Sequence, residues 1–486
     1  MKPHITLPFL LLMMFNMNAA EKPNIIFLLA DDLGYADLAC FGSKVVKSPH
    51  LDKLASEGMI LTNCYSASPN CSPARTGILT GRSPYRVGMY DFARFKDLHI
   101  PKDELTIAEI LRDSGYQTMF AGKWHCSGDF PNQPNPGDHG FTHWLAHPKN
   151  FGKDPAGFYR NGKALEPIKG WMAEIVVDEA MSFISKRDSS KPFMTMLWFS
   201  EPHTPVLAAD EFIKLYENES TEKAASKLKF GGPQVIRNRA KEDKKNLYFG
   251  CISMMDHHIG RLLNFLREKK LDQNTIIVFT SDNGPEHRVD TSFGSPGNLR
   301  GAKGHIHEGG YKVPGIVKWP GKLKANSKSA EPVNGTDWLP SLAAVAKASF
   351  KPTKTIDGTN VFPALIEGKK VKRLKPMLWW LYHARGAKEI SMRYGKYKIL
   401  ANMLPQSKIG INDSSPPAGK SIMDFIKKSD IGNFSLYNLE DDPNETKDLA
   451  KSNPEQLEEL KKIMIQLHQE IKTEGPVYNL SRKKKK

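Results

Sequence analysis

The chain has 486 residues, of which 40% are hydrophobic and 25% are charged, so wholesale disorder is excluded and a globular protein is expected. This length exceeds one ordinary hydrophobic core and predicts two domains, or one large domain with an appendage. Lysine and arginine outnumber aspartate and glutamate by 69 to 53, giving a formal net charge of +16. That excess favours a polyanionic partner: a nucleic acid, an acidic membrane or an acidic polysaccharide.

The first twenty residues have the pattern of a secretory signal. Lys2 provides a positive start, and residues 7–14 (LPFLLLMM) form an apolar stretch too short to span a bilayer. Small residues precede Glu21, so we predict cleavage after Ala20 and a secreted or periplasmic protein; a buried N-terminal helix is the alternative. No later apolar run reaches the ~20 residues that a membrane-spanning helix needs.

Continuous apolar runs in the next part of the chain predict buried parallel strands. The runs are residues 24–30 (NIIFLLA), 193–199 (FMTMLWF) and 275–280 (TIIVFT). Helical patterns alternate with them, at residues 106–114, 173–185 and 248–266. The alternation predicts an α/β domain over residues 21–370, with a mainly parallel sheet between helices.

The pattern changes after about residue 370. Residues 369–375 (KKVKRLK) are predicted to form a basic linker. Short alternating stretches and one helical pattern then predict a small α+β domain with an antiparallel sheet over residues 371–481. The stretches are residues 377–382, 389–393 and 396–400, and the helix is residues 454–471. The charge run at 482–486 is interpreted as a solvated basic tail.

One of the five cysteines, Cys71, is a candidate functional residue. Five cysteines without a CxxC pair argue against a disulfide framework and a structural zinc site, although one disulfide stays open. Ser72 suits an N-cap and Pro73 suits a first helical turn, which predicts that Cys71 lies at the mouth of a helix. Free backbone N–H groups there, with Arg75 one turn along, favour an anion. Cys71 is a candidate activated thiol; a buried structural cysteine is the alternative.

Polar residues follow the predicted strands at their carboxyl ends, where ligands collect in parallel sheets. Asp31 and Asp32 follow the first strand, residues 201–203 follow the second, and Asp282 and Asn283 follow the third. Carboxylate and amide oxygens are the ligands that a hard divalent cation prefers. Aspartates that cap turns are the alternative interpretation.

Residues 71–82 (CSPARTGILTGR) resemble the signature of the type I sulfatases, a family in which the cysteine is oxidised to formylglycine after translation. Six further stretches resemble blocks of the same family across nearly the whole mature chain. They are residues 24–34, 122–125, 202–205, 281–284, 300–303 and 436–450. The resemblance implies an alkaline-phosphatase-like catalytic domain followed by the small C-terminal domain.

The resemblance also implies a cofactor set. Asp31, Asp32, Asp282 and Asn283 bind Ca2+ in this interpretation, and the residue made from Cys71 completes the site. The hydrated aldehyde of formylglycine carries one hydroxyl that attacks sulfur and a second that allows sulfate to be expelled. A plain serine or cysteine lacks that second hydroxyl.

Roles for the cationic and imidazole side chains follow from the same resemblance. Arg75, Lys123 and Lys303 neutralise sulfate charge in the transition state. His125 and His203 transfer protons near neutral pH. His203 and Lys303 act on the leaving oxygen.

Four further residues are candidates for binding the substrate. Arg300 and His305 flank Lys303, and His383 and Arg385 follow the predicted strand at 377–382. The latter pair could hold a sugar or a second sulfate. A transition-metal pair at His305 and its neighbour His307, or ordinary polar residues of the small sheet, are the alternatives.

The function that these expectations define is sulfate-ester hydrolysis on a sulfated carbohydrate. The N-terminal half resembles the glycan sulfatases, the N-acetylgalactosamine-6-sulfatases among them, and the expected partners are a sulfated glycan and a formylglycine-generating or sulfatase-maturing enzyme, with no nucleic acid. One alternative is a phosphodiesterase or phosphonate monoester hydrolase of the same superfamily, whose members tend to carry histidine where this chain has Asn283. The other is a basic glycan-binding protein without catalysis, against which the intact Cys71, Arg75, Lys123 and His125 argue.

Overall fold

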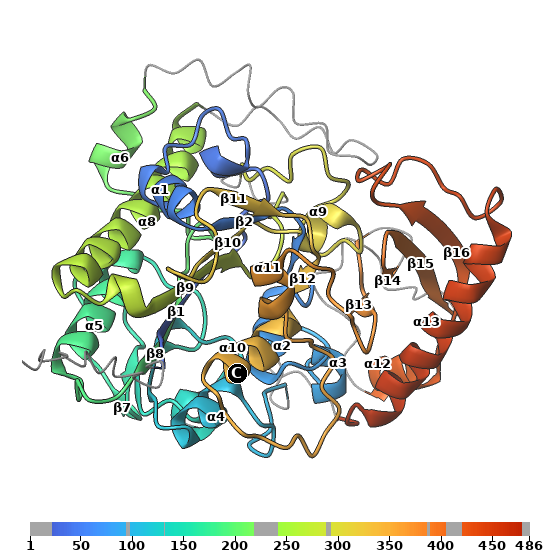
Figure 1. The fold of residues 1–486 in the computed structure, drawn as a ribbon, viewed down its shortest axis with the longest axis horizontal. Helices are drawn as coiled ribbons and strands as arrows, with labels where there is room; N and C mark the ends of the chain where they lie inside the picture. Colours follow the sequence, from blue (N-terminus) through green and yellow to red (C-terminus); the bar gives the residue numbers. More distant parts are fainter. Residues whose placement is uncertain are drawn as a thin grey trace, which may run out of the picture.

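The computed structural model describes residues 22–93, 98–130, 132–217, 242–287, 293–385, 389–404 and 420–478. The predicted signal at 1–20 and the basic tail at 482–486 lie outside the described residues. Figure 1 shows a large unit of helices and strands, with a smaller sheet and its helices at one side of it. The predicted α/β fold with a small antiparallel sheet is confirmed, while a domain boundary near residue 370 stays a prediction.

The large sheet has a parallel centre. Within the described residues it has ten strands, in the order β11-β2-β10-β9-β1-β8-β4-β5-β6-β7. Five adjacent strands are parallel: β9 (Thr275–Ser281), β1 (Asn24–Ala30), β8 (Phe193–Trp198), β4 (Gln117–Lys123) and β5 (His143–His147). The strands outside this centre are β2 (Met59–Leu61), β10 (Gly315–Lys318), β11 (Ser327–Ser329), β6 (Tyr159–Arg160) and β7 (Lys163–Ala164). The parallel centre brings the carboxyl ends of β1, β8, β9 and β4 to one edge of the sheet.

Alternate residues of β1 enter two separate hydrophobic cores, which explains its continuous apolar sequence. Ile26 and Leu28 face a core shared with helices α1 (Pro49–Glu57), α5 (Met172–Lys186) and α8 (Glu242–Glu268). Helix α8 packs against both α1 and α5 on that face of the sheet.

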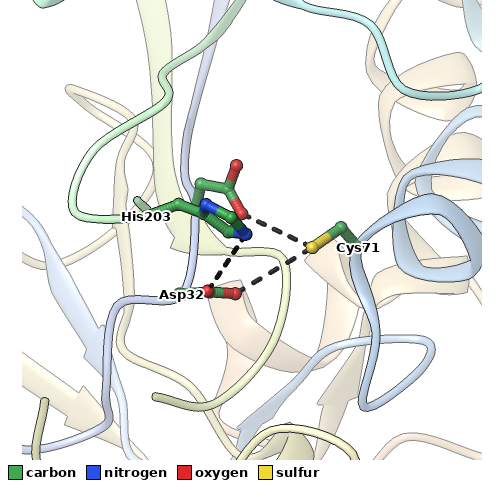
Figure 2. Close-up of side chains that lie close together, drawn as sticks. Asp32, Cys71 and His203 are labelled. Atoms are coloured by element: carbon green, nitrogen blue, oxygen red, sulfur yellow. Dashed lines mark hydrogen bonds and ion pairs between the residues drawn. The ribbon is translucent and has the colours of Figure 1, made fainter. Parts of the chain in front are cut away.

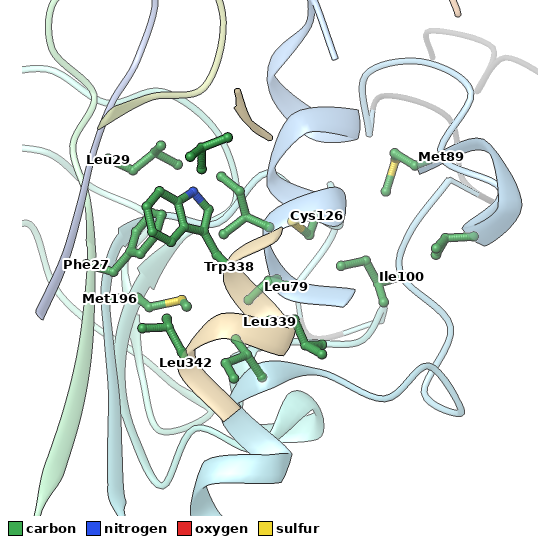
Figure 3. Packing of buried hydrophobic residues seen from close by; sticks show 14 of the residues in the cluster. Phe27, Leu29, Leu79, Met89, Ile100, Cys126, Met196, Trp338, Leu339 and Leu342 are labelled. Atoms are coloured by element: carbon green, nitrogen blue, oxygen red, sulfur yellow. The ribbon is translucent and has the colours of Figure 1, made fainter. Parts of the chain in front are cut away.

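The opposite face of β1 meets the helix that begins at Cys71. Phe27 and Leu29 enter the core formed with α2 (Cys71–Thr80), α4 (Ile107–Asp113) and α10 (Trp338–Val345). Figure 3 shows this packing, in which Trp338 meets Phe27 edge to face with ring centroids 5.7 Å apart. Helix α2 is buried along its whole length, so the position of its first residue is tightly determined.

The smaller unit is a four-stranded antiparallel sheet in the order β13-β14-β15-β16. Its strands are β13 (Met377–Trp380), β14 (Ile390–Tyr394), β15 (Tyr397–Leu404) and β16 (Asp430–Asn438). Helix α13 (Pro454–Glu474) packs on β15 and β16, and α12 (Lys420–Lys428) packs on α13. The sequence predicted the first three strands and α13, but it did not predict β16 or α12.

Short elements complete the described chain. They are β3 (Cys64–Tyr65), β12 (Val333–Asn334), α3 (Pro84–Val87), α6 (Asp210–Lys214), α9 (Glu308–Tyr311), α11 (Phe362–Glu367), and the 3-10 turns Ala39–Phe41, Pro136–His139, Asp272–Asn274 and Gly335–Asp337. All five cysteines are free, so the disulfide that the sequence left open is not formed. Among the described residues, no helix is both long enough and apolar enough to cross a membrane.

The predicted capping of α2 is wrong in one detail. Asn70, in extended conformation, is the N-cap, and Ser72 lies inside the first turn. The hydroxyl of Ser72 instead accepts a hydrogen bond from the backbone N–H of Ala93 at 3.0 Å. Ser72 therefore ties α2 to the segment after α3 rather than starting the helix.

Candidate active site

The carboxyl ends of β1 and β9 place four oxygen-bearing side chains together. Ala30 and Ser281 are paired across these parallel strands, so the residues that follow each strand are neighbours. The backbone N–H of Asp32 donates to Asp282 Oδ1 at 3.2 Å, and Asn283 Nδ2 donates to Asp32 Oδ1 at 2.7 Å. Asp31, Asp32, Asp282 and Asn283 are all buried.

Cys71 approaches this group from the first residue of α2. Its thiol donates to Asp31 Oδ1 at 3.5 Å and lies 3.9 Å from Asp32 Oδ1. Figure 2 shows Cys71, Asp32 and His203 converging from three separate segments of the chain. Burial, with the charge of Asp282 adding to it, raises the pKa of the Cys71 thiol well above its ordinary value. The thiol in this place is therefore not a ready thiolate nucleophile.

Three buried cations neutralise the three carboxylates. Arg75 donates to Asp282 Oδ2 from Nε at 2.9 Å and from Nη2 at 2.8 Å. Lys123, the last residue of β4, pairs with Asp31, and Lys303 Nζ lies 2.6 Å from Asp32 Oδ1. Each carboxylate thus has its own cation, which makes the burial of so many charges tolerable.

Two histidines lie at the rim of this cluster. His203 follows β8; its Nε2 is 3.6 Å from Asp32 Oδ2, and its ring also contacts the amide of Asn150. His125 follows β4, and the half-buried Phe92 stacks on it with ring centroids 6.1 Å apart. Burial, with the charge of Lys123 adding to it, lowers the pKa of His125 well below its ordinary value. The imidazole of His125 is therefore uncharged near neutral pH.

Two residues at this site have an unusual backbone conformation. Asp32 has φ 66° and His125 has φ 53°, in the left-handed region that residues other than glycine rarely adopt. Such conformations persist only where the surrounding structure imposes them, and they gather at functional sites. Here both residues turn at the ends of parallel strands, β1 and β4, where their side chains meet the cluster.

The donor set fits a hard divalent cation. Asn283 Oδ1 is buried, and no described residue donates a hydrogen bond to it. Ligand atoms of Asp31, Asp32, Cys71 and His203 lie within 4.8 Å of one another. Carboxylate oxygens next to an amide oxygen that lacks a donor are the chemistry that Ca2+ requires.

The four predicted substrate-binding residues are engaged outside this cluster. Arg300 donates to the backbone carbonyl of Glu445, and His305 Nδ1 contacts the backbone carbonyl of Ala302. Burial lowers the pKa of His305 to about 3, so its ring is uncharged near neutral pH.

The other two follow strand β13 of the smaller sheet. Nε2 of the half-buried His383 is 3.5 Å from Asp91 Oδ1. Arg385 is only 7% exposed and makes a two-armed pair with Glu286, at 3.1 and 3.2 Å. Substrate binding by all four residues stays a prediction.

Two neighbours of the histidines were missed by sequence reasoning. Asn150 orients His203, and Phe92 covers His125. Each lies in a loop with no periodic pattern, and neither belongs to a stretch that resembles a family block. Only the folded chain brings them to the rim of the site.

Comparison with known proteins agrees with this geometry. The family model for the sulfatases matches residues 23–348. Human arylsulfatase A is 29% identical over 469 residues, which cover 94% of this chain and 90% of the relative. Human N-acetylgalactosamine-6-sulfatase is 28% identical over 494 residues, which cover 93% and 86%. The solved structure of Ps i-CgsB in complex with k-i-k-neocarrahexaose aligns with a TM-score of 0.77 and 26% identity over 95% of each chain.

A parallel sheet that ends in a buried cluster of carboxylates, cations and a helix-initiating cysteine defines a hydrolase of the alkaline-phosphatase-like superfamily. Because the family model spans about two thirds of the residues, the chain belongs to the sulfatase family, and it is a sulfatase. The family predicted from the sequence is therefore confirmed.

Proposed function

We propose that this enzyme removes sulfate from a sulfated carbohydrate, with formylglycine made from Cys71 as its nucleophile and Ca2+ as its metal. The observation that carries the proposal is the position of Cys71. Its Sγ faces the carboxylates of Asp31 and Asp32 from the start of α2, inside a cluster of three buried cations. That place suits an oxygen nucleophile and an anionic substrate.

A thiolate at this position would face two carboxylate oxygens within 4 Å and would be repelled by both. The hydrated aldehyde of formylglycine would instead supply two neutral hydroxyls, and with them the chemistry for attack on sulfur and for release of sulfate. Arg75, one turn along α2, holds Asp282 and the carbonyl of Lys123 and so keeps the helix start against the strand ends. A formylglycine-generating or sulfatase-maturing enzyme is the partner that this modification needs.

Asp31, Asp32, Asp282 and Asn283 would hold the cation, which supplies positive charge to polarise the sulfate ester and to orient the nucleophile. The unpartnered Oδ1 of Asn283 supports this assignment. The three carboxylates and three cations of the cluster balance one another. Any added divalent cation therefore makes the site positive, as an anionic ester requires.

The remaining side chains handle charge and protons. Lys123, paired with Asp31, can share the charge that develops on the sulfate oxygens, and Lys303, paired with Asp32, can stabilise the leaving oxygen. His203 lies beside Asp32 and Lys303, within reach of a leaving oxygen that needs a proton. The neutral His125 is placed to accept the proton of the second hydroxyl.

The substrate class rests on charge and on relatives. The net charge of +16 of the full chain suits a polyanionic glycan. One relative is named N-acetylgalactosamine-6-sulfatase, and a similar solved structure holds k-i-k-neocarrahexaose. We therefore propose a sulfated polysaccharide or oligosaccharide as the substrate, and secretion or export to the periplasm as the destination.

The test compares matched esters. Enzyme produced with a maturing enzyme should release sulfate from nitrophenyl sulfate and from at least one member of a panel of sulfated oligosaccharides. It should act far less on nitrophenyl phosphodiesters and phosphonates. The Cys71→Ala variant should release sulfate from neither nitrophenyl sulfate nor the sulfated oligosaccharides. Faster hydrolysis of the phosphorus esters would make the chain a phosphodiesterase or phosphonate hydrolase, and no turnover of any ester would make it a binding protein.

A further inference from the structure

Lys303 lies on a loop, residues 300–308, which we name the Lys303 loop. The loop is closed on itself by the N–H of Gly309, which donates to Arg300 O at 2.7 Å. Its middle is tied by backbone bonds, from Lys303 N to Pro285 O and from Gly304 N to Pro69 O, both at 3.0 Å. Pro69 precedes α2, so the loop lies directly beside the helix that carries Cys71.

One residue of the C-terminal domain holds both ends of the Lys303 loop. Arg300 Nη1 donates to the backbone carbonyl of Glu445 at 3.2 Å. At the other end, the N–H of Glu308 donates to Glu445 Oε2 at 2.8 Å, and His307 Nδ1 lies 3.2 Å from Glu445 Oε1. Glu445 is 1% exposed and lies in the segment after β16. These contacts join parts of the chain that are far apart in the sequence.

The carboxylate of Glu445 is itself locked in place. Lys398, on β15, is fully buried, and its Nζ lies 2.7 Å from Glu445 Oε1 and 3.2 Å from Glu308 Oε1. Tyr65 donates to the other oxygen of Glu308 at 2.8 Å. All four carboxylate oxygens of Glu308 and Glu445 therefore have partners. A fully satisfied buried network of this kind is rigid, because any shift leaves a charge unpaired.

We propose that Glu445 is a positioning residue for Lys303, so that the C-terminal domain sets the geometry of the catalytic lysine. A lysine side chain is long and flexible, and where its ammonium rests depends on how firmly its backbone is held. The Lys303 ammonium lies 2.6 Å from Asp32, where it can reach the sulfate ester. The inference rests on the proposed role of Lys303 at the leaving oxygen. A displacement of about 1 Å can cost about 100-fold in rate.

The test variant is Glu445→Gln, which keeps the shape but removes the charge. The matched control is Glu179→Gln. Glu179, on α5, also bonds a histidine and a cation: His143 on β5 at 2.7 Å and Arg160 on β6 at 2.6 Å. We expect Glu445→Gln to lower kcat about tenfold to 100-fold on a sulfated sugar, with KM little changed. Nitrophenyl sulfate, whose leaving group needs no help, should lose much less, and Glu179→Gln should alter neither rate.

A double-mutant cycle separates positioning from a general structural effect. In a Lys303→Ala background, Glu445→Gln should cause no further loss, because the group that it positions is gone. Losses that multiply in the double variant would overturn the proposal, and so would equal losses on both substrates. Full activity of Glu445→Gln on the sugar sulfate would overturn it as well.

A second readout does not depend on turnover. Amide hydrogen exchange of residues 300–308 should be faster in Glu445→Gln than in the wild type and unchanged in Glu179→Gln. Unchanged exchange in Glu445→Gln would contradict the anchoring even if no substrate were ever found. If the wild type releases no sulfate while exchange of residues 300–308 is still faster in Glu445→Gln, the result would count against the proposed function alone. If Glu445→Gln does not fold, His307→Gln removes one loop contact, leaves Lys398 paired, and is expected to act in the same direction.

Discussion

Two buried charged clusters in this protein are built from similar side chains and are satisfied to different degrees. The first, which we propose to be catalytic and call the catalytic cluster, contains Asp31, Asp32, Asp282, Arg75, Lys123 and Lys303. The anchoring cluster contains Glu308, Glu445, Lys398 and His307. Every carboxylate oxygen of the anchoring cluster is bonded. Beside the catalytic cluster, Asn283 Oδ1 and His125 Nδ1 are buried without a partner among the described residues.

A buried polar atom without a partner costs about 1–3 kcal/mol, so proteins keep few of them. Unpartnered polar atoms lie beside the catalytic cluster but not within the anchoring cluster, which indicates that the two clusters have different roles. The anchoring cluster is complete as the chain folds and serves to hold segments together. The catalytic cluster is completed by groups that the chain does not contain, which we propose to be Ca2+ and the sulfate ester.

The largest expected effect of a substitution on activity is at the proposed nucleophile, Cys71. Cys71→Ala should lower sulfate release by more than about 10⁴-fold, because no other group can take its place. It should change the free energy of unfolding by only about 1 kcal/mol, since one buried sulfur atom is removed. Rate assays and denaturant unfolding of the same preparation measure both quantities. Substantial turnover by this variant would remove Cys71 from the mechanism.

The anchoring cluster should show the opposite pattern. Lys398→Met leaves two buried carboxylates without their cation and should lower the free energy of unfolding by about 3–5 kcal/mol. Lys102→Met, which breaks the exposed pair with Asp138, should change it by less than about 1 kcal/mol. Equal effects of the two variants in urea titrations would show that the anchoring cluster contributes no more than a surface pair.

The stabilisation that the anchoring cluster provides should be lost over a defined range of acidic pH. Burial raises the pKa of Glu445, but the charges of Lys398 and then His307 outweigh it and lower that pKa to about 2, from 4.5. A lowered folded-state pKa means that the stabilisation is complete above about pH 4.5 and is lost as the pH falls toward 2. The unfolding free-energy gap between the wild type and Glu445→Gln should therefore be constant from pH 7 to 5. It should shrink below that by up to about 3 kcal/mol. A gap that stays constant down to pH 3 would contradict the assignment.

Metal removal should affect only the catalytic cluster. Exhaustive chelation should abolish activity and lower the free energy of unfolding by about 3 kcal/mol, if Ca2+ was present at about 100 times its Kd. Asp282→Ala should be inactive and should show no further change on chelation. Thermal unfolding with and without chelator measures this, and an active chelated enzyme would exclude the metal.

Much of the fold was predictable because the central strands are buried on both faces. The apolar runs at 24–30, 193–199 and 275–280 became β1, β8 and β9 almost residue for residue. Strand β16 was missed because its first half is mostly half-buried or exposed and carries no clear alternation. Strand β4 was missed because its sequence, QTMFAGK, mixes polar and small residues with apolar ones.

The candidate site was predictable where residues lie next to a strand end or a helix start. Asp31, Asp282 and Cys71 follow from such positions together with the family resemblance. The direction of a loop side chain cannot be predicted in this way: Arg300, next to Lys303 in the loop, donates to the backbone carbonyl of Glu445 in the segment after β16. The contact of Glu445 with Glu308 joins positions 137 residues apart, which no spacing in the sequence indicates.

We propose that the residue at position 71 acts as an aldehyde-derived nucleophile within the catalytic cluster, and the extent of its modification tests this role most directly. Preparations made with increasing amounts of a maturing enzyme would contain increasing fractions of the aldehyde, measured by mass spectrometry of the peptide that contains Cys71. We expect specific activity on a sulfate ester to rise in proportion to that fraction and to fall to zero with it. Undiminished sulfate release by a preparation that contains only the thiol would contradict the account.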